Sequence, residues 1–510
     1  MKNLVISVPR LEIHRPPIST AIVAETIRLS GQEVEAMDLN CDFFHYLPDR
    51  QAYYNYDEIW DKSRAPTLSE AKNIVKFIKS KFKDMDKYDR YWISVFGGSA
   101  TLFTSMLCNL IRKHLKNKFI ILGGQGVQDM DMITKKNNMF GEVMRSSGLC
   151  DLYLAGEGEL IIKHVLDGET EGPGINNINS LQINELDTLP YPNYSFYDLD
   201  KYDYLQKDKE VFIVGSRGCV RRCTYCDVAR YWPKFRYRSG KNIAMEMINH
   251  YEKHGVKHFY FTDSLINGSM KAFNDMCDVL AKYNTDHKAG FEWKGQFIFR
   301  PKNQLPNDHF ATVATAGGKE FYVGVETGSD KIRWEMDKKF TNEDIDYQLE
   351  EFNKHGITVF FLMLIGYVTE THEDHNETLK MFKRWQKYVA TGTIKGIDLG
   401  VGLKFLPNTP LEKKIDQHGV YFLKGDLSLA ETQHKTDLWQ AKSNPDLDVP
   451  ERIRRRIETH EEAIRYNWPI WRGEQRLNGV KLMTEKYLRF IQDQPQEPKK
   501  ITLENLNFFE

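Results

Sequence analysis

The stretch Gly218-Cys-Val-Arg-Arg-Cys-Thr-Tyr-Cys226 places three cysteines in the spacing C-x3-C-x2-C, directly after an apolar run that is typical of a β-strand. Three thiolates on one short loop can converge on a single metal centre. A closed zinc site needs four protein ligands, whereas an iron–sulfur cubane held by three cysteines leaves one iron open to another ligand. Because the loop offers no fourth ligand, the spacing favours an iron–sulfur cluster.

A zinc site is the alternative for the same residues. Cys223-x2-Cys226 is followed by His250-x3-His254, which superficially resembles a zinc finger. The two pairs are 23 residues apart, beyond the roughly 12–15 residues typical of that motif, and Cys219 would be left over. A zinc-stabilised interaction protein without catalytic activity is therefore the hypothesis from another class.

Length and composition limit the remaining possibilities. The 510 residues correspond to about three domains. Lys and Arg number 70 against 71 Asp and Glu, so no bulk charge gathers nucleic acid or anionic lipid. Seven cysteines, an odd number in a long chain, argue against a disulfide framework and for a reducing compartment. The longest apolar stretch, 359–365, is far shorter than the ~20 residues of a membrane helix, so we expect a cytoplasmic protein without a membrane span.

The first ~170 residues alternate apolar runs with helical periodicity, which predicts a parallel sheet covered by helices. Three of the expected strands, at 92–96, 119–122 and 151–155, deliver glycines at their carboxyl ends, where open α/β sheets place ligands. None of these turns completes G-x-G-x-x-G, and no Walker sequence is present. Nicotinamide or triphosphate binding is therefore not supported.

The rest of the chain divides into three parts. Residues 174–205 lose the periodicity and contain Leu189-Pro-Tyr-Pro192, as an interdomain linker does. Six further strands alternate with helical segments, which fits a full or partial barrel. We expect these strands at 211–215, 257–262, 291–299, 320–325, 357–365 and 396–403. Beyond about 415 the chain is polar and helical, and its densest charge run, 451–458, is predicted to be a solvated helix face.

The cysteine loop and the strand before it resemble the radical S-adenosylmethionine (SAM) enzymes, within them the branch with an N-terminal cobalamin-binding-type domain. The resemblance covers about residues 1–415. It implies a [4Fe–4S] cluster on Cys219, Cys223 and Cys226 whose open iron chelates SAM. An electron then cleaves a carbon–sulfur bond of SAM and releases a 5′-deoxyadenosyl radical.

The resemblance also implies residues that contact SAM. Tyr225 matches the aromatic residue that lies near the adenine, and 261–268 and 324–329 resemble strand-end segments that meet its methionine or ribose parts. Arg300, at the end of the expected third strand, is placed to pair with the SAM carboxylate. The residues assigned to SAM binding are Tyr225, Asp263, Ser264, Arg300, Glu326 and Ser329. For each, an ordinary loop cap or ion pair is the alternative.

The expected fifth strand departs from the family pattern. Residues 364–371 read Leu-Ile-Gly-Tyr-Val-Thr-Glu-Thr, where related proteins commonly have a glycine, a proline and then Gly-Glu-Thr. The sequence therefore predicts different turn chemistry there.

The N-terminal segment resembles cobalamin modules in its Pro16-Pro17 entry, its Gly123-Gly124 turn and its Gly156-Glu-Gly-Glu159 segment. The resemblance implies cobalamin contacts from Gly98, Ser99, Gly123, Gly124, Gly156 and Glu157. The D-x-H-x-x-G sequence that supplies an imidazole to cobalt is absent, since the only Asp-x-His is Asp416-Gln-His418. If cobalamin binds, we expect no histidine on its lower face.

These observations define the expected architecture. The fold class is α/β, with a Rossmann-like, cobalamin-binding-type domain, a partial (β/α)6 TIM-type barrel and a mainly helical C-terminal region. The predicted boundaries are 1–173 for the first domain, 174–205 for the linker, 206–415 for the radical SAM barrel and 416–510 for the C-terminal region.

The expected function is radical chemistry on a small-molecule or peptide substrate, started by SAM cleavage and including cobalamin-dependent methyl transfer. The alternative is a cobalamin-free docking domain joined to a radical enzyme for rearrangement, cyclisation or RNA modification. An external one-electron donor such as a flavodoxin or ferredoxin is implied. The basic and aromatic run 230–238 is able to stack bases, but beside the cysteines we expect it to pack around the cofactor, and the near-zero net charge argues against RNA.

Overall fold

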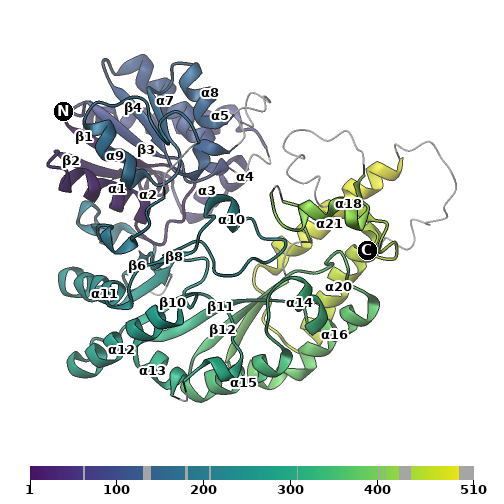
Figure 1. The fold of residues 1–510 in the computed structure, drawn as a ribbon. Helices are drawn as coiled ribbons and strands as arrows, with labels where there is room; N and C mark the ends of the chain where they lie inside the picture. Colours follow the sequence, from purple (N-terminus) through teal and green to yellow (C-terminus); the bar gives the residue numbers. More distant parts are fainter. Residues whose placement is uncertain are drawn as a thin grey trace.

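The computed structural model describes residues 1–60, 64–129, 139–178, 182–205, 208–306, 308–399, 402–406, 408–423 and 438–492. Figure 1 shows an N-terminal α/β domain above a larger curved sheet with outer helices, and a helical C-terminal region at one side of both. Among the described helices, none combines the length and the apolarity that a bilayer crossing requires.

The N-terminal domain is a five-stranded parallel sheet in the order β2-β1-β3-β4-β5. Its strands are β1 (Asn3–Ser7), β2 (Val34–Asp38), β3 (Arg90–Ser94), β4 (Phe119–Gly123) and β5 (Leu152–Leu154). Alternate residues of the strands face opposite sides, so each face of the sheet has its own apolar core. The strand order reverses between β1 and β3, and open α/β sheets bind ligands beyond the strand ends at such a point.

Helices cover both faces of this sheet. On one face lie α1 (Ile18–Leu29) and α9 (Gly158–Leu166), and on the other α5 (Leu68–Ser80) and α7 (Thr101–His114). The aromatic stretch between β2 and β3 also forms the short helices α2 (Leu39–Tyr46), α3 (Arg50–Tyr54), α4 (Asp57–Trp60) and α6 (Phe82–Met85). The sequence did not reveal them, because their buried aromatic residues follow no helical period. Phe43, for example, packs edge-on against Tyr56, Trp60 and Phe77.

Between the two sheets the chain forms three short 3-10 helices, η3 (Leu186–Thr188), η4 (Tyr194–Phe196) and η5 (Leu199–Lys201). This segment packs against the barrel. Tyr194 is fully buried, and its hydroxyl donates to the carbonyl of Phe212 at 2.8 Å.

The larger sheet has six parallel strands in the order β13-β12-β11-β10-β9-β6. These strands are β6 (Glu210–Ile213), β9 (His258–Phe261), β10 (Glu292–Phe297), β11 (Gly318–Glu326), β12 (Thr358–Met363) and β13 (Ile394–Asp398). The outer helices are α11 (Gly240–His254), α12 (Met270–His287), α13 (His309–Thr315), α15 (Asn342–His355), α16 (His372–Arg384) and α17 (Gln386–Ala390). All six expected strands are present, although residues 400 and 401 of the last lie outside the described residues. The predicted partial (β/α)6 barrel is confirmed.

The connections between the strands of the larger sheet, and the C-terminal region, contain further short strands and helices. They are the antiparallel pair β7 (Ser216–Arg217) and β8 (Arg236–Tyr237), the helices α10 (Val228–Tyr231), α14 (Asp330–Glu335) and α18 (Ile415–His418), the 3-10 helix η7 (Glu412–Lys414), and the pair β14 (Val420–Phe422) and β15 (Trp439–Ala441). Of the C-terminal region predicted at 416–510, residues 424–437 and 493–510 lie outside the described residues.

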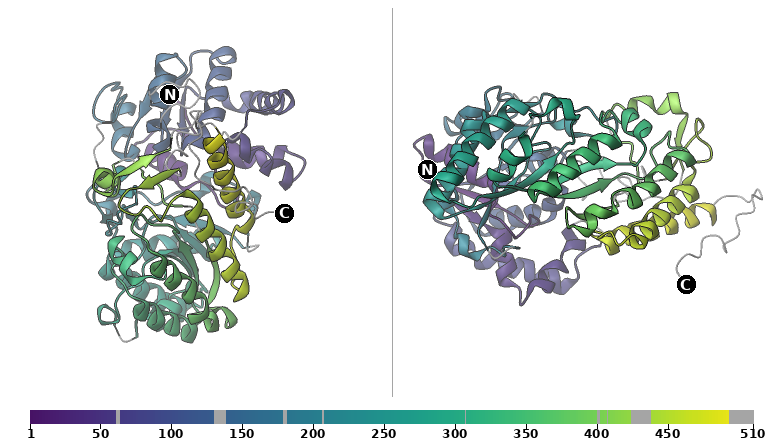
Figure 2. Two further views of the ribbon diagram at one scale, coloured as in Figure 1. Left: turned by 90° about the vertical axis from the view of Figure 1, so that its right-hand side faces the viewer. Right: turned by 90° about the horizontal axis from the view of Figure 1, so that it is seen from below.

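Two long helices, α20 (Val449–Arg465) and α21 (Gly473–Gln492), form most of this region (Figure 2): α20 packs against α16, and α21 packs against α20. The chain between them adds to the open edge of the barrel sheet, because Ile397 donates to the carbonyl of Pro469 and Trp471 donates to that of Ile397, each at 2.9 Å. The C-terminal region therefore closes the side of the barrel where β13 would otherwise end the sheet.

The prediction of a solvated face for 451–458 is wrong. Arg452, Arg455 and Arg456 of α20 are buried. The guanidinium of Arg452 lies 3.9 Å from the ring centre of Trp439, and Arg455 is ion-paired. A helix that packs on neighbours with carboxylates and an indole buries arginine where composition alone suggests solvent.

Candidate functional site

The cysteine loop is the connection between β7 and β8, and its base is tightly closed. Gly218 has a φ of +88°, and a Cβ atom there would lie 2.8 Å from the carbonyl of Lys234, so only glycine fits. Within the loop, Cys226 N donates to the carbonyl of Cys223 at 3.1 Å, and Arg221 N donates to Sγ of Cys219 at 3.4 Å. The loop backbone therefore holds the cysteines in a compact turn.

The three thiols are partly exposed and close enough to influence one another. Burial raises the pKa of each, and the charge of a neighbouring cysteine raises it further. The ammonium of Lys338 opposes this by lowering the pKa of all three. The site thus supplies thiol ligands together with a positive charge that favours their thiolate forms.

This donor set fits a [4Fe–4S] cluster better than a single metal ion. Within the described residues, no three His, Cys, Asp or Glu side chains are arranged to bind one ion. In a cubane each cysteine ligates a different iron, so the thiolates need not meet at one point. Three free cysteines on one loop, with one iron left for another ligand, match that requirement.

Glu326 links the cysteine loop to the end of β11. Its Oε1 accepts from the Tyr225 hydroxyl at 2.8 Å and lies 2.7 Å from Nζ of Lys338. The register between β11 and β12 shifts here, and Glu326 has a φ of +67°, a conformation that side chains rarely adopt. Burial alone would lower the pKa of Lys338, but Glu326 and the cysteine thiolates raise it, so the ammonium stays charged.

The other residues assigned to SAM binding have different surroundings. The carboxylate of Asp263 accepts from Gly215 N at 2.9 Å and Ser216 Oγ at 2.6 Å, and burial raises its pKa to about 6. Ser329 caps α14 and donates to Asp374 Oδ1 at 2.7 Å. Glu326 thus contacts Tyr225 of the cysteine loop. Asp263 and Ser329 instead form hydrogen bonds with other parts of the protein. Their SAM contacts stay predictions.

Arg300 offers a donor for an anionic ligand. Its Nη2 donates to the carbonyls of Asn267 at 2.6 Å and Gly268 at 3.1 Å. Its Nε is buried and has no hydrogen-bond partner among the described residues. A buried guanidinium donor is costly to leave unpaired, and the pairing of Arg300 with the SAM carboxylate stays a prediction.

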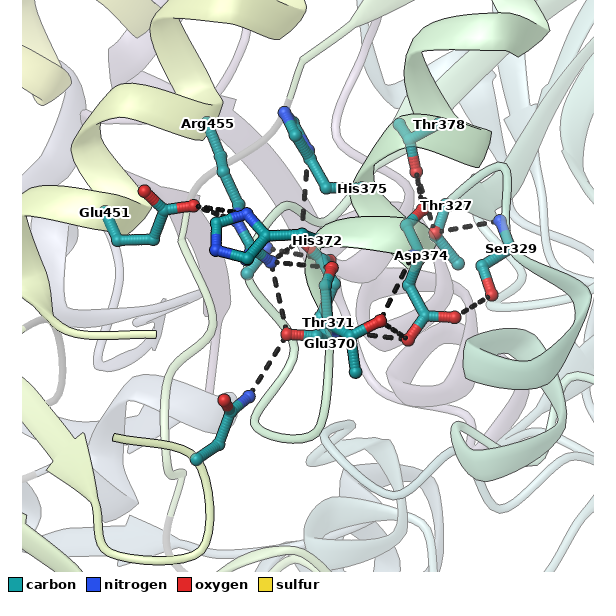
Figure 3. Close-up of polar contacts among 12 residues, drawn as sticks. Thr327, Ser329, Glu370, Thr371, His372, Asp374, His375, Thr378, Glu451 and Arg455 are labelled. Atoms are coloured by element: carbon teal, nitrogen blue, oxygen red, sulfur yellow. Dashed lines mark hydrogen bonds and ion pairs between the residues drawn. The ribbon is translucent and has the colours of Figure 1, made fainter. Parts of the chain in front are cut away.

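The unusual turn after β12 is held by the C-terminal region, as Figure 3 shows. Glu370 and Arg455 are almost completely buried and form an ion pair at 2.9 Å. Thr371 caps α16 in a reciprocal arrangement with Asp374, and Asp374 in turn accepts from Ser329. A continuous polar network therefore runs from α20 to the end of β11. Sequence motifs gave no sign of it, because its members are far apart in the chain.

A cavity of about 2190 Å³ separates the strand ends of the N-terminal sheet from the barrel. From the N-terminal domain it is lined by Ser99, Gly123, Gly124, Gly156 and Glu157, five of the six residues predicted to contact cobalamin; Gly98 is not among the lining residues. From the barrel it is lined by Arg217, Gly218, Trp232, Thr262 and Ser264, among others. The cavity thus lies between the glycine turns and the base of the cysteine loop.

Comparison with known proteins identifies the barrel. Residues 213–382 match the model of the radical SAM superfamily. The central domain is a radical SAM domain. The prediction of a [4Fe–4S] cluster and SAM as cofactors is thereby confirmed, and the match begins six residues before Cys219.

Curated relatives of the chain include an uncharacterized methyltransferase from Pyrococcus horikoshii, 24% identical over 323 residues, which are 59% of this chain and 66% of the relative. For the first three curated relatives the aligned regions cover 66%, 48% and 38% of their lengths, so the chain spans less than two thirds of each.

Two solved structures share the architecture around the radical SAM domain. The cobalamin-dependent SAM radical enzyme OxsB, with aqua-cobalamin and SAM bound, has a TM-score of 0.62 at 15% identity, over 96% of this chain and 72% of that one. The radical SAM methyltransferase TsrM from Kitasatospora setae has a TM-score of 0.59 at 16% identity, over 91% and 89%. At such identities the likeness is one of fold, and it confirms the predicted fold class.

Proposed function

We propose that the chain is a cobalamin-dependent radical SAM enzyme that transfers a methyl group to an unactivated atom of a small-molecule or peptide substrate. The observation that carries the proposal is the large cavity between the glycine turns and the cysteine loop. Its volume exceeds the roughly 300–1,000 Å³ of ordinary ligand pockets, which suits a macrocyclic cofactor with space left for a substrate. The methyltransferase and cobalamin names among the similar proteins support the same assignment.

The residues of the chain have distinct parts in this proposal. When bound, the cluster and SAM supply a one-electron cleavage that yields a carbon-centred radical, and cobalamin supplies a methyl carrier. Lys338 lowers the pKa of the cysteines against the larger effect of burial and so favours the thiolates that bind metal, and Glu326 accepts hydrogen bonds from ribose hydroxyls. Arg300 pairs with the SAM carboxylate through its unpartnered Nε. Phe96 and Trp232 supply aromatic surface to the cavity wall.

The proposal includes a partner and a compartment. The electron comes from an external one-electron donor such as a flavodoxin or ferredoxin. Seven free cysteines support a reducing compartment, and we place the protein in the cytoplasm on that basis.

Anaerobic reconstitution with iron and sulfide, followed by assay with SAM and a reductant, tests the central claim. We expect two products from SAM. Radical initiation yields 5′-deoxyadenosine, and donation of the methyl group leaves S-adenosylhomocysteine. Hydroxocobalamin added to the protein is expected to co-elute on gel filtration. No retention of the corrin removes the cobalamin claim, whereas one zinc per chain without iron removes the radical claim.

Gly123 permits a direct test of the cavity. A Cβ atom at Gly123 meets no atom within 4 Å, and Gly123 lines the cavity, so we expect a larger side chain there to extend into the cavity. We expect Gly123→Phe to weaken hydroxocobalamin binding at least ~10-fold, equivalent to about 1.4 kcal/mol, and to leave thermal unfolding nearly unchanged. Gly123→Ala is the matched control and is expected to bind almost normally. Equal binding by the Phe and Ala variants would place the corrin elsewhere.

The lower face of the corrin is a separate question. His14 is the one histidine among the described residues that line the cavity, and its Nδ1 lies 2.6 Å from the carbonyl of Asp203. The sequence predicts no histidine ligand to cobalt. Electron paramagnetic resonance of the Co(II) form checks this, since nitrogen splitting that disappears in His14→Ala would contradict it.

Glu326→Gln is expected to weaken SAM binding by about 10-fold or more, because a hydrogen bond to a charged group contributes about 1.5–3 kcal/mol. Anaerobic equilibrium dialysis with the reconstituted protein measures this. Glu320→Gln, the same change near the opposite end of β11, where Glu320 pairs with Lys395 at 2.9 Å, is the control. SAM affinity that falls equally in both variants would argue for a general effect on the strand.

A further inference from the structure

The segment after β5 meets the base of the cysteine loop in a buried cluster of four charges. Glu157 lies 3.2 Å from Nη1 of Arg217 and 2.5 Å from Nη2 of Arg236, and Glu159 lies 2.5 Å from Nη2 of Arg217. No side chain of the four is more than 13% exposed. Two carboxylates from the N-terminal domain thus neutralise two guanidinium groups from the radical SAM domain.

Most polar atoms of the cluster are hydrogen-bonded within the protein, although Arg236 Nε is buried without a hydrogen-bond partner among the described residues. Ile183 N donates to Glu157 Oε2 at 2.6 Å, and Arg236 Nη1 donates to the carbonyl of Ile183 at 2.5 Å. The ring of Trp232 lies 5.6 Å from the guanidinium carbon of Arg217 and 5.7 Å from that of Arg236. The Glu157 carboxylate, predicted from the resemblance to contact cobalamin, is therefore engaged with the barrel.

The position of the cluster gives it influence over the cysteines. Arg217 and Arg236 face each other across the β7–β8 pair, which brackets the cysteine loop, and Arg217 is two residues before Cys219. In Figure 1, β8 and α10 lie between the N-terminal domain and the barrel. Glu157, Glu159, Arg217 and Trp232 also line the large cavity. One buried cluster therefore touches the cavity, the N-terminal domain and the base of the loop.

We propose that Arg217 is a positioning residue through which Glu157 and Glu159 of the N-terminal domain hold the cysteine loop in its cluster-retaining arrangement. An occupant of the cavity reinforces that hold; this second part rests on the proposed cobalamin function. Removing Arg217 leaves Glu159 as a buried carboxylate without its ion-pair partner, and Glu157 with Arg236 alone, so the loop is expected to shift until water or other groups reach Glu159. An ion pair that contributes only to stability would instead leave cluster retention unchanged in the folded protein.

The test uses the full-length protein with its cluster reconstituted and measures iron loss to a ferrous chelator under anaerobic conditions. We expect Arg217→Gln to lose iron about five-fold faster or more than wild type, with altered g values of the reduced cluster. Glu157→Gln is expected to do the same, although Glu157 belongs to the other domain. Arg217→Lys keeps the charge and is expected to restore most of the retention.

Arg384→Gln is the matched control, because Arg384 of α16 forms an exposed ion pair with Asp346 of α15. Thermal unfolding of the apo forms separates loop effects from loss of fold. If Arg217→Gln does not fold, Glu157→Gln and Arg217→Lys decide. Wild-type rates of iron loss in the folded Arg217 and Glu157 variants would overturn the proposal.

A second measurement adds hydroxocobalamin to the same reaction. We expect it to slow iron loss several-fold in wild type and to have little effect in Arg217→Gln, as linkage between two sites requires. If hydroxocobalamin binds without slowing iron loss, the reinforcement by an occupant is wrong. If it does not bind, the proposed cobalamin function fails, and the chelator measurement alone still decides the positioning role of Arg217.

Discussion

Replacing Cys219, Cys223 or Cys226 with Ala is expected to abolish both the iron–sulfur absorbance near ~400 nm and the formation of 5′-deoxyadenosine. The loss is complete for each because two remaining thiolates cannot hold a cubane with a single iron left open for SAM. The measurement is an absorbance spectrum and iron content after reconstitution, followed by chromatography of the SAM products.

The effect is expected to be specific to these three thiols. Cys277 is fully buried in α12, and burial raises its pKa well above the ordinary value, so it presents no thiolate. Cys277→Ala is therefore the control, and it is expected to keep the cluster and SAM cleavage. Retained cleavage in any one of the three loop variants, or a cluster lost equally in Cys277→Ala, would refute the assignment.

Features that depend on local sequence were predictable. The helix α1 and the six barrel strands follow from periodicity over a few residues, and the cysteine loop follows from ligand spacing within one turn. The glycines at the ends of β3 and β4 also indicated a ligand edge, because parallel strands bring their carboxyl ends to the same side of a sheet. In each case the residues that determine the feature lie within a single helix, strand or loop.

Contacts between distant segments were not predictable. Lys338 follows α14 in an irregular segment, more than 100 residues beyond the cysteines whose pKa it lowers. The pairing of Glu157 with Arg217 depends on how two domains meet, and nothing in either local sequence records it. Single charged residues have many possible partners, so only the assembled fold selects one.

The charge run 451–458 is a second feature whose surroundings depend on a distant segment, and here the sequence led to a wrong prediction. Alternating signs along a helix are compatible with a solvated surface, and Arg454 is 39% exposed. Its neighbour Arg455 is 1% exposed because the turn after β12 places Glu370 against that face. Which face of an amphipathic helix is covered depends on the partner, and the partner here is about 85 residues earlier in the chain.

This burial makes Arg455→Met the substitution with the second largest expected effect. Arg455 pairs with Glu370 at 2.9 Å and with Glu451 at 2.7 Å, and it donates to the backbone carbonyls of Glu370 and Thr371. Without it Glu370 is a buried, uncompensated carboxylate, so we expect a loss of about 3–5 kcal/mol in the free energy of unfolding. Urea unfolding and thermal unfolding measure the loss.

The matched control is Arg454→Met, the adjacent arginine, whose exposed pairs with Glu451 and Glu458 contribute about 0–1 kcal/mol. The double variant Glu370→Gln with Arg455→Met is expected to recover part of the loss, because it removes the buried charge itself. Equal destabilisation by the Arg454 and Arg455 single variants would show that the buried pair does not anchor the turn after β12.

The pH dependence of Arg455→Met gives an independent check of the same cause. Burial raises the pKa of Glu370 above its ordinary value, and Arg455 opposes that rise in the wild type. Without Arg455 the pKa rises further, so the folded variant takes up a proton on Glu370 more readily than its unfolded chain. The contribution of Glu370 to the stability of the variant is then fully present below the pKa of Glu370 in the unfolded chain. This contribution is lost as pH rises through the raised pKa of Glu370 in the folded variant. We therefore expect Arg455→Met to approach wild-type stability near pH ~5 and to fall furthest below it near pH ~8, whereas a loss of equal size at both values would assign the effect to packing.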